Sequence, residues 1–449
     1  MDERLTPPAA MAPSHATGRQ APVDLGAVAP ADDNERTKDG RPLHDEAKLR
    51  HVGNAEWLGQ ILQSAPSDVT AEELERPWVW AAPDDGPALV GWGEQARFEA
   101  SGDAPMTHAW QDFAQWAGEG RDRLPAFGSF PFDPAQPGFL VVPRVLVMRE
   151  RPGAATRVFP ADAADPRPAD FAVASELHVN FTLPRGSREH WTEAVDATRA
   201  VLSEPVGSDT GEVMQKVVLA RRVHARADRA LDQRRILATL AARFTDCWTF
   251  SHDGLVGATP ELLAEVHDGV FHCRILAGTR KPKWDEELLT DPKERREHEL
   301  SVTSVTTHLA QAGLLDAQVT GPFLLRLPNV THLATDIRAT VRPGHGSADI
   351  SDLLYPTAAI CGAPRDLAFA QIQRVEGLDR GRFSGPVGWL RPDGSGQWAL
   401  ALRCAQFDDG SRNADLFAGA GILPDSDAGR EWLETDAKME PMRRALSAG

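Results

Sequence analysis

Cysteines and long apolar runs are scarce in this sequence of 449 residues, and its 48 Lys and Arg are outnumbered by 65 Asp and Glu. The four cysteines, Cys247, Cys273, Cys361 and Cys404, are too widely spaced for a CxxC pair, a zinc ribbon or a disulfide framework, so we expect buried small hydrophobic side chains. The net charge of −17 opposes binding to nucleic-acid phosphates and to anionic lipids. No apolar run approaches the roughly 18 residues of a membrane span. These absences predict a protein that binds neither nucleic acid nor membrane.

The first residues of the sequence do not predict a targeting signal. Acidic residues and prolines follow Met1 where a secretory signal would have an apolar segment, and the Arg-rich pattern of a transit peptide is missing. We therefore expect a cytoplasmic protein. The 42% of hydrophobic and 25% of charged residues are typical of a globular protein with a sizeable core.

The chain divides into three regions by composition. Residues 1–45 are rich in Pro, Ala, Asp, Arg and Gly and have almost no large apolar side chains, which predicts a disordered tail. Residues 46–188 combine scattered tryptophans, Pro-rich turns and short apolar runs, which is typical of a β-rich lobe. Residues 189–446 contain polar residues within apolar segments separated by Gly and Pro. We therefore expect the functional residues in this third region.

The pattern of the third region predicts an α+β protein. Two strand-like runs at 383–391 and 397–407, joined across the turn 392–396, favour antiparallel sheets with flanking helices over a doubly wound parallel sheet. The predicted helices are 189–204, 230–243, 291–312, 350–354 and 428–446, and the predicted strands are 214–224, segments around 246–265 and 269–277, 333–341, 383–391, 397–407 and 413–421.

Lys216 lies in a segment, 215–221, whose residues are apolar on both faces. This pattern is typical of a strand that is buried on both sides, so the lysine would point into the interior. A buried ammonium group tends to lose its proton, which suits a general base. The alternative is a lysine at a strand end whose ammonium group reaches water.

Acidic side chains occur at two further places of interest. Glu261 follows a turn of small residues and precedes an apolar strand, so it is either a surface group or a buried acid whose raised pKa lets it protonate a leaving oxygen. In the predicted helix 291–312, Glu294, Glu297 and Ser301 share one face. The alternative for these glutamates is a solvated surface with arginine partners.

The predicted carboxy-terminal helix carries Glu431, Glu434 and Lys438 at i, i+3 and i+7, and therefore on one face. Gathered carboxylates suit Mg²⁺, which takes few protein ligands and keeps positions open for water and substrate oxygens. A row of surface salt bridges is the alternative.

Arg403 and several glycines could bind an anion. The alternation within 398–405 puts Arg403 on a face of alanines, with room for a bidentate carboxylate, whereas the alternative is a rim arginine paired with an acidic neighbour. Gly419 and Gly421 could expose backbone amides, although the third glycine and the helix of a dinucleotide fingerprint are missing. Gly278 either approaches a ligand or permits a turn.

Nine motifs, taken in this order, resemble those of the chorismate-utilising enzymes and, within that superfamily, of the isochorismate synthases. The resemblance covers about 190–445, which is more than half of the chain. The motifs are QKVVLAR at 215–221, GATPELL at 257–263, AGTR at 277–280, REHE at 296–299, HLAT at 332–335, PTAAICG at 356–362, LRCA at 402–405, FAGAG at 417–421 and EWLET at 431–435.

The resemblance implies an Mg²⁺-dependent isomerisation of chorismate to isochorismate. It implies a chorismate-binding fold with two lobes of antiparallel β-sheet packed together, helices outside and the site in the cleft. Lys216 would activate the water that attacks C2, and Glu261 would protonate the departing C4 hydroxyl. Glu297 and Glu434 would hold Mg²⁺, with Glu431 beside it. The residues expected to bind the substrate are Arg403 and the amides of Gly419 and Gly421 at the carboxylates, and Lys438, Gly278, Thr279, His332 and Thr335 along the pocket.

Particular positions separate the branches of this family. Anthranilate synthases resemble the chain less at Lys216, and aminodeoxychorismate synthases carry a lysine in place of Ala277. Salicylate synthases, which also eliminate pyruvate from isochorismate, typically carry Tyr in place of Phe383 and a different segment at 357–362. The salicylate synthase is therefore the main alternative. Tyr355 stands where His is common in the family.

Two further alternatives concern partner proteins. The chain could be a subunit of an anthranilate or aminodeoxychorismate synthase, or a catalytically silent binding subunit. The presence together of Lys216, Glu261, Glu297, Glu434 and Arg403 argues against the silent subunit. We expect a monomer with no obligate protein partner. Whether its product enters menaquinone, siderophore or salicylate biosynthesis depends on the neighbouring enzymes.

Overall fold

The computed structural model describes residues 41–42, 52–83, 86–118, 124–160, 163, 167–168, 177–203, 213–280, 282–311, 316–328, 330–408 and 412–448. The predicted tail, 1–45, lies outside these residues except for Arg41 and Pro42. None of the helices in the described ranges is both long enough and apolar enough to span a membrane.

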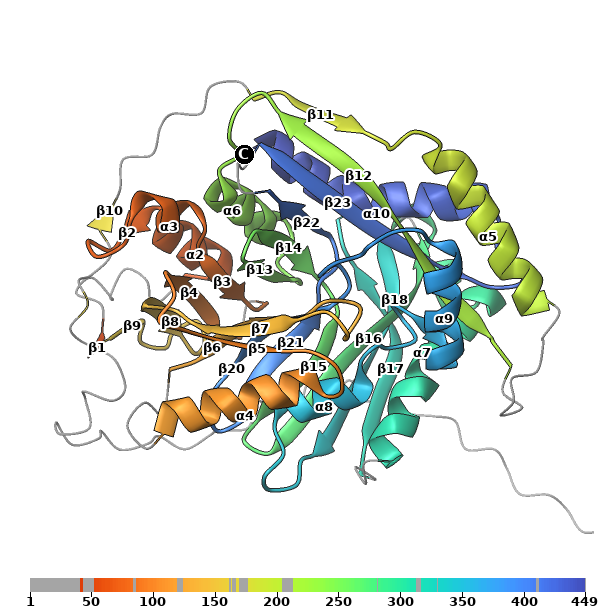
Figure 1. Ribbon diagram of the computed structural model, residues 1–449. Helices are drawn as coiled ribbons and strands as arrows, with labels where there is room; N and C mark the ends of the chain where they lie inside the picture. Colours follow the sequence, from red (N-terminus) through yellow and green to blue (C-terminus); the bar gives the residue numbers. More distant parts are fainter. Residues whose placement is uncertain are drawn as a thin grey trace, which may run out of the picture.

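Two open antiparallel sheets form the centre of the molecule (Figure 1). In order across the first sheet, the strands are β1 (Arg41–Pro42), β9 (Arg157–Phe159), β8 (Val145–Arg149), β4 (Ala88–Trp92), β3 (Trp78–Ala81), β13 (Trp248–His252), β14 (Leu255–Thr259), β22 (Cys404–Phe407), β23 (Asn413–Ile422), β12 (Lys216–Ala227) and β11 (Val179–Thr182), with the short β19 (Gly362–Ala363) also paired to β12.

The second sheet also combines strands from distant parts of the chain. Its order is β17 (Gln318–Arg326), β18 (Thr331–Thr340), β16 (Val270–Arg280), β15 (Leu262–His267), β21 (Gly396–Leu400), β20 (Pro386–Leu390), β6 (Ala126–Ser129), β7 (Gly138–Val142) and β5 (Ala96–Ala100). A small third sheet pairs β2 (Ser64–Ala65) with β10 (Arg167–Pro168). Because β3 pairs with β13 and β6 pairs with β20, the regions 46–188 and 189–446 share both large sheets.

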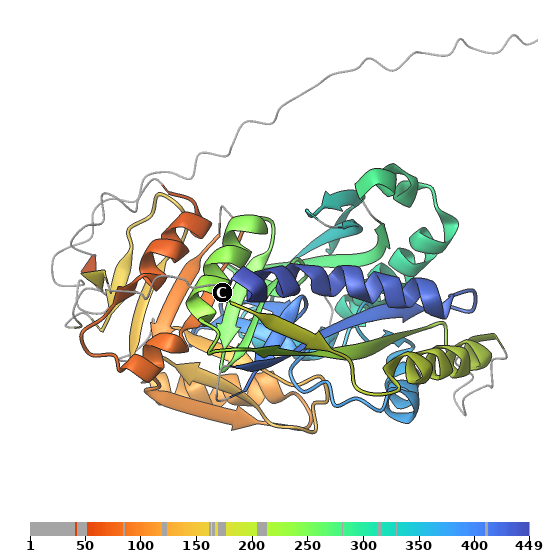
Figure 2. The same ribbon diagram turned by 90° about the horizontal axis from the view of Figure 1, so that it is seen from above.

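Helices cover the outer faces of these sheets, as Figures 1 and 2 show. Side chains of α2, α6 and α10 pack with the first sheet, and side chains of α4 and α8 pack with the second. The helices are α2 (Asn54–Leu62), α3 (Ala71–Glu75), α4 (Pro105–Ala117), α5 (Ser187–Ser203), α6 (Gln233–Arg243), the 3₁₀ helix η2 (Pro282–Leu289), α7 (Pro292–Gln311), α8 (Ser347–Leu354), α9 (Arg365–Val375) and α10 (Ala428–Ala448). The α+β class predicted from the sequence is therefore confirmed.

The strand β3 shows why this arrangement buries both faces of a sheet. Alternate side chains of a strand point to opposite faces. Trp78 and Trp80 accordingly pack in the cluster between the two sheets, with residues of β6 and β20, whereas Val79 and Ala81 pack against helices α2 and α6. Each face thus removes a separate set of apolar side chains from water.

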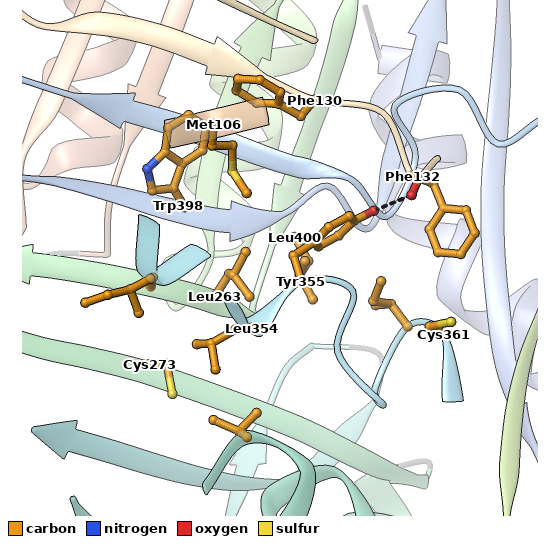
Figure 3. Close-up of a cluster of buried hydrophobic side chains, with 14 of the residues drawn as sticks. Met106, Phe130, Phe132, Leu263, Cys273, Leu354, Tyr355, Cys361, Trp398 and Leu400 are labelled. Atoms are coloured by element: carbon orange, nitrogen blue, oxygen red, sulfur yellow. Dashed lines mark hydrogen bonds between the residues drawn. The ribbon is translucent and has the colours of Figure 1, made fainter. Parts of the chain in front are cut away.

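The outer face of the second sheet carries the cluster shown in Figure 3. Leu263 of β15 and Trp398 of β21 pack there with Met106 of α4 and Leu354 of α8. Tyr355 belongs to the same cluster, and its hydroxyl donates to the carbonyl oxygen of Phe132 at 3.1 Å. Tyr355, which stands where His is common in the family, is therefore a core residue. All four cysteines are buried and unpaired, as predicted.

The hairpin at 383–407 is only partly as predicted. Strands β20 and β21 pair antiparallel, with Pro386 opposite Leu400, and Gly394 adopts a φ of +86° in the turn between them. The single strand predicted at 397–407 is wrong, because the chain leaves the second sheet at Leu400 and joins the first at Cys404. Arg403 lies between the two strands with a φ of +50°.

The face assigned to Arg403 by strand alternation is therefore wrong too. The apolar pattern continues through 398–405 because the end of β21, the start of β22 and most of the connection between them are buried. Such a pattern does not show where a chain changes sheets.

Candidate active site

Residues of both sheets, α7 and α10 line a cavity with about 670 Å³ of space that no protein atom fills, open solvent included. Apolar side chains form part of its wall, among them Leu276, Ile360, Phe383 and Phe417. Nine of the predicted site residues line it: Glu261, Gly278, Thr279, Glu297, His332, Arg403, Gly419, Gly421 and Lys438. Four others, Lys216, Thr335, Glu431 and Glu434, are not among the lining residues.

Lys216 is fully buried at the start of β12, so the alternative of a lysine that reaches water is wrong. Its Nζ lies 3.1 Å from Oε1 of Glu297, which does line the cavity, and 3.3 Å from Oγ of Ser301. Gly421 leaves space for this pair, because a Cβ atom there would overlap with the Glu297 carboxylate. The lysine therefore contacts the cavity through an ion pair on its wall.

Glu261 is buried between β14 and β15, which excludes the surface alternative. Burial raises the pKa of Glu261 to about 8, even though the positive charges of Lys216 and Arg403 oppose the shift. The carboxyl group is consequently protonated at neutral pH. A protonated carboxyl on a cavity wall can donate its proton to a departing oxygen.

The backbone of β23 presents polar groups on the side away from β12. The amide of Val218 donates to Cys361 O at 2.8 Å, and the amide of Ala220 donates to the Glu376 carboxylate at 2.7 Å, so neither bonds to β23. These residues stand opposite Gly421 and Gly419, respectively. Opposite residues that do not bond to each other direct their amides outward. The amides of Gly419 and Gly421 therefore point away from β12, as an anion site requires.

Arg403 binds a histidine rather than an acidic neighbour. Its Nη2 lies 2.9 Å from Nε2 of His332, and Nδ1 of that histidine lies 3.0 Å from Oγ1 of Thr279. Burial, together with the charges of Arg403 and Lys438, lowers the pKa of His332 well below its usual value. The neutral ring accepts from Arg403 at Nε2, so its Nδ1–H faces Thr279. This chain of contacts orients the guanidinium at the cavity.

Four glutamates gather beside these groups, and each has a polar partner. Glu297 pairs with Lys216, Glu431 with Lys293 at 3.1 Å and Glu434 with Lys438 at 2.6 Å. Sequence reasoning placed Glu294 on the face of Glu297 but did not select it. Its carboxylate accepts from the amide of Thr279 at 2.9 Å, and burial together with Glu297 and Glu434 raises the pKa of Glu294 to about 7.

The donor set of this cluster suits a hard divalent cation. Carboxylate oxygens are the ligands that Mg²⁺ prefers, and burial together with the neighbouring Glu434 raises the pKa of Glu431. Across the ranges that the structure describes, however, no three acidic, histidine or cysteine side chains are close enough to hold a metal ion. Glu297 and Glu434 would have to turn away from their lysines to do so.

Thr335 lies behind the cavity rather than on its wall. Its Oγ1 is 2.7 Å from Nε2 of His298, whose Nδ1 is 3.2 Å from Ala277 O. Thr335 thus connects β18 with α7 and β16, because His298 belongs to α7 and Ala277 to β16.

One buried ion pair at the cavity was missed by sequence reasoning. Arg380 lines the cavity, and both oxygens of the Glu376 carboxylate accept from it at 2.6 Å. A glutamate and an arginine four residues apart are typical of an exposed helix face, so the spacing gave no sign of burial.

Comparisons with known proteins agree with this geometry. A protein-family model described as chorismate binding enzyme matches residues 172–447. The isochorismate synthase EntC of Escherichia coli (strain K12) is 30% identical over 370 residues, which are 77% of this chain and 89% of that protein.

Two solved structures have the same fold. MenF, the menaquinone-specific isochorismate synthase from Escherichia coli, has a TM-score of 0.69 and 26% identity over 87% of this chain and 91% of its own. The putative 2,3-dihydroxybenzoate-specific isochorismate synthase DhbC from Bacillus anthracis has a TM-score of 0.70 and 24% identity over 87% of this chain and 100% of its own.

Proposed function

Because the chain belongs to the family of chorismate binding enzymes, we propose that it converts chorismate to isochorismate. The observation that carries this proposal is the position of two groups at one cavity. Glu261 has a carboxyl group that is protonated at neutral pH, and Lys216 reaches the same cavity through Glu297. An acid and a base at one site are what the exchange of a hydroxyl group between two ring carbons requires.

In the proposed reaction, Lys216 takes a proton from the water that attacks C2 of chorismate. The ring double bonds shift, and the C4 hydroxyl departs as water after Glu261 gives it a proton. One water enters and one leaves, so the product is an isomer of the substrate. An ammonium paired with a carboxylate cannot accept a proton, so this role requires Lys216 to give up a proton and act as the neutral amine, as well as to separate from Glu297.

The substrate is a dianion and needs cationic and amide partners within a protein of net charge −17. We assign one carboxylate to the guanidinium of Arg403 and the outward amides of Gly419 and Gly421. Lys438 supplies a further ammonium, which now contacts Gly419 O at 2.9 Å. Gly278, Thr279 and His332 complete the wall around these groups.

We assign Mg²⁺ to Glu297 and Glu434, with Glu431 beside it through water. Bound there, the cation would supply the positive charge that these glutamates now take from Lys216 and Lys438 and would polarise a substrate oxygen. Glu294 would lie at the edge of this site through its bond to the Thr279 amide. Thr335 has a supporting role behind His298.

The test is to incubate the purified protein with chorismate and Mg²⁺, separate the products by chromatography and assay pyruvate in the same tube. We expect isochorismate without pyruvate, and no product after chelation of the metal or in the Lys216→Ala variant. Pyruvate together with salicylate would assign the chain to the salicylate synthases in spite of Phe383. No turnover, with or without ammonia, would contradict the enzyme function and favour a silent subunit.

The monomeric state, the absence of an obligate protein partner and the cytoplasmic location are part of the same proposal. Light scattering of the purified protein and cell fractionation test them. Co-purification of a glutaminase, with activity from ammonia, would instead favour a subunit of an anthranilate or aminodeoxychorismate synthase.

A further inference from the structure

Five residues other than glycine have a positive φ within the described ranges. Asp253 and Asp268 lie in the turns of the β13–β14 and β15–β16 hairpins, and Ala104 precedes helix α4. The other two, Ser384 with a φ of +59° and Arg403 with a φ of +50°, are buried and line the cavity. Within the described ranges, the two buried residues other than glycine that have left-handed backbones are therefore both at the candidate active site.

A left-handed backbone is unfavourable for any side chain, and glycine adopts it at no steric cost. For Arg403 the reason to keep a side chain is evident, because its guanidinium is at the cavity. The same argument applies to Ser384, where a glycine would fit the backbone better. The serine side chain is a single hydroxymethyl group, so the hydroxyl is the only polar group that serine adds relative to glycine.

The hydroxyl of Ser384 has a second unfavourable feature. Its Oγ is buried, and none of the described residues provides a hydrogen-bond partner for it, although its backbone amide donates to Ala401 O at 2.9 Å. The neighbouring Phe383 is stacked on Phe417 with ring centroids 5.3 Å apart. A buried hydroxyl without a partner destabilises the protein that carries it.

We propose that Ser384 is a substrate-binding residue whose hydroxyl donates a hydrogen bond to a carboxylate oxygen of the substrate. This inference rests on the function proposed above. Ser384 bonds through its amide to Ala401, two residues before Arg403, so the two side chains leave neighbouring parts of the backbone. We place the carboxylate assigned to Arg403 beside this hydroxyl, and because the Oγ is buried in the structure without substrate, its binding requires neighbouring side chains to shift. Both unfavourable features of Ser384 are compensated when this carboxylate binds.

The test uses Ser384→Ala, which removes the hydroxyl, and Ser384→Gly, which also relieves the backbone. We expect both variants to raise the KM for chorismate by about 10- to 100-fold, since hydrogen bonds to charged groups are in this range. In the protein without substrate, neither variant lowers Tm, because each removes an unpartnered buried group. A purely structural serine would show the reverse pattern, with a lower Tm and an unchanged KM.

Ser251→Ala is the matched control. Ser251 of β13 also has a buried Oγ without a partner among the described residues, but it does not line the cavity. Its replacement should leave Tm the same or higher and KM unchanged.

Calorimetric titration with chorismate separates the two levels of the proposal. If the wild type binds chorismate without converting it, the proposed function fails, while a weaker Kd in both Ser384 variants still supports the binding role. A KM and a Kd within twofold of the wild type in both variants would overturn that role.

Discussion

Two ion pairs of the same i, i+4 spacing lie beside the cavity and differ in how completely their groups are bonded. Glu376 and Arg380 are each 2% exposed, and the carboxylate receives two bonds of 2.6 Å. Glu434 and Lys438 are 27% and 14% exposed and share one recorded contact of 2.6 Å. The first pair has the bonding of a structural element, whereas the second is free to exchange partners.

The Glu376–Arg380 pair, which we call the closed pair, takes the place of a neighbouring strand at the edge of β12. Strand β19 pairs with β12 only at Lys216 and Val217. Beyond it, Arg380 donates to Val218 O at 2.7 Å and the Glu376 carboxylate accepts from the Ala220 amide. A guanidinium can serve a carboxylate and a carbonyl together because its donors are fixed in one plane, which an ammonium cannot match.

The Lys216–Glu297 and Lys438–Glu434 pairs, which we call the open pairs, each join a lysine to a glutamate. They are the groups that the proposed reaction uses. Lys216 and Glu297 are joined by one contact of 3.1 Å, and Lys438 and Glu434 are joined by one contact of 2.6 Å. A compact ammonium on a flexible stem can leave one carboxylate for another partner. The comparison therefore indicates that bond number, rather than burial alone, separates the structural pair from the pairs assigned to the proposed reaction.

The largest effect should come from an open pair. Replacing Lys216 by Ala removes the proposed base, and general bases contribute roughly 10²- to 10⁴-fold to a rate. We expect kcat/KM for chorismate to fall by about that factor, measured by chromatography of the product. Turnover at the wild-type rate would show that the lysine is a structural group like Arg380.

Breaking the closed pair should act on stability. Glu376→Gln leaves the Arg380 guanidinium buried without its counter-charge, and loss of one partner of a buried pair costs about 3–5 kcal/mol. The expected result is a lower midpoint of urea unfolding. The double variant Glu376→Gln, Arg380→Met should recover part of this loss, and an unchanged midpoint in the single variant would remove the distinction drawn here.

The acid Glu261 gives a pH test of the cavity. Its pKa of about 8 means that the proton-donating form is present below that pH, so kcat/KM should decline above about pH 8. Glu261→Gln should lower the rate by roughly 10²-fold and abolish this alkaline decline. A decline that persists in the variant would assign it to another group.

The raised pKa of Glu261 should also make the stability of the protein depend on pH. Because the folded pKa of Glu261 lies above its usual value, the folded protein holds a proton that the unfolded chain releases. The contribution of this group to stability is therefore complete below the usual pKa of 4.5 and is lost as the pH rises towards about 8. Unfolding midpoints of the wild type and Glu261→Gln over this range measure the difference.

The smallest effect is expected from a third pair of the same spacing on α10. Glu440 and Arg444 approach to 2.6 Å, but they are 39% and 63% exposed. Exposed pairs contribute about 0–1 kcal/mol, so Glu440→Gln should change the unfolding free energy by less than about 1 kcal/mol and leave kcat/KM unchanged. A large loss in either measurement would mean that spacing matters more than burial.

Much of the secondary structure could be predicted from periodicity, because strands and helices repeat their apolar residues at different intervals. The segment containing Lys216 is the clearest case, since apolar residues on both faces indicated a buried strand, and Lys216 is indeed fully buried. The errors lie where elements meet. The strand predicted through Arg403 is divided between two sheets, and nothing local distinguishes burial in one sheet from burial in the other.

The sequence by itself determined the α+β class, most of the elements of residues 189–446 and, through nine ordered motifs, the family to which the chain belongs. These are properties of local pattern and of residue identity. Only the tertiary structure decided which charged groups pair, that Arg380 forms a buried ion pair with Glu376, and that Ser384 has a buried hydroxyl without a partner in the described ranges. Burial and hydrogen bonding depend on segments far apart in the chain, so the same spacing of four residues produced a closed, an open and an exposed ion pair.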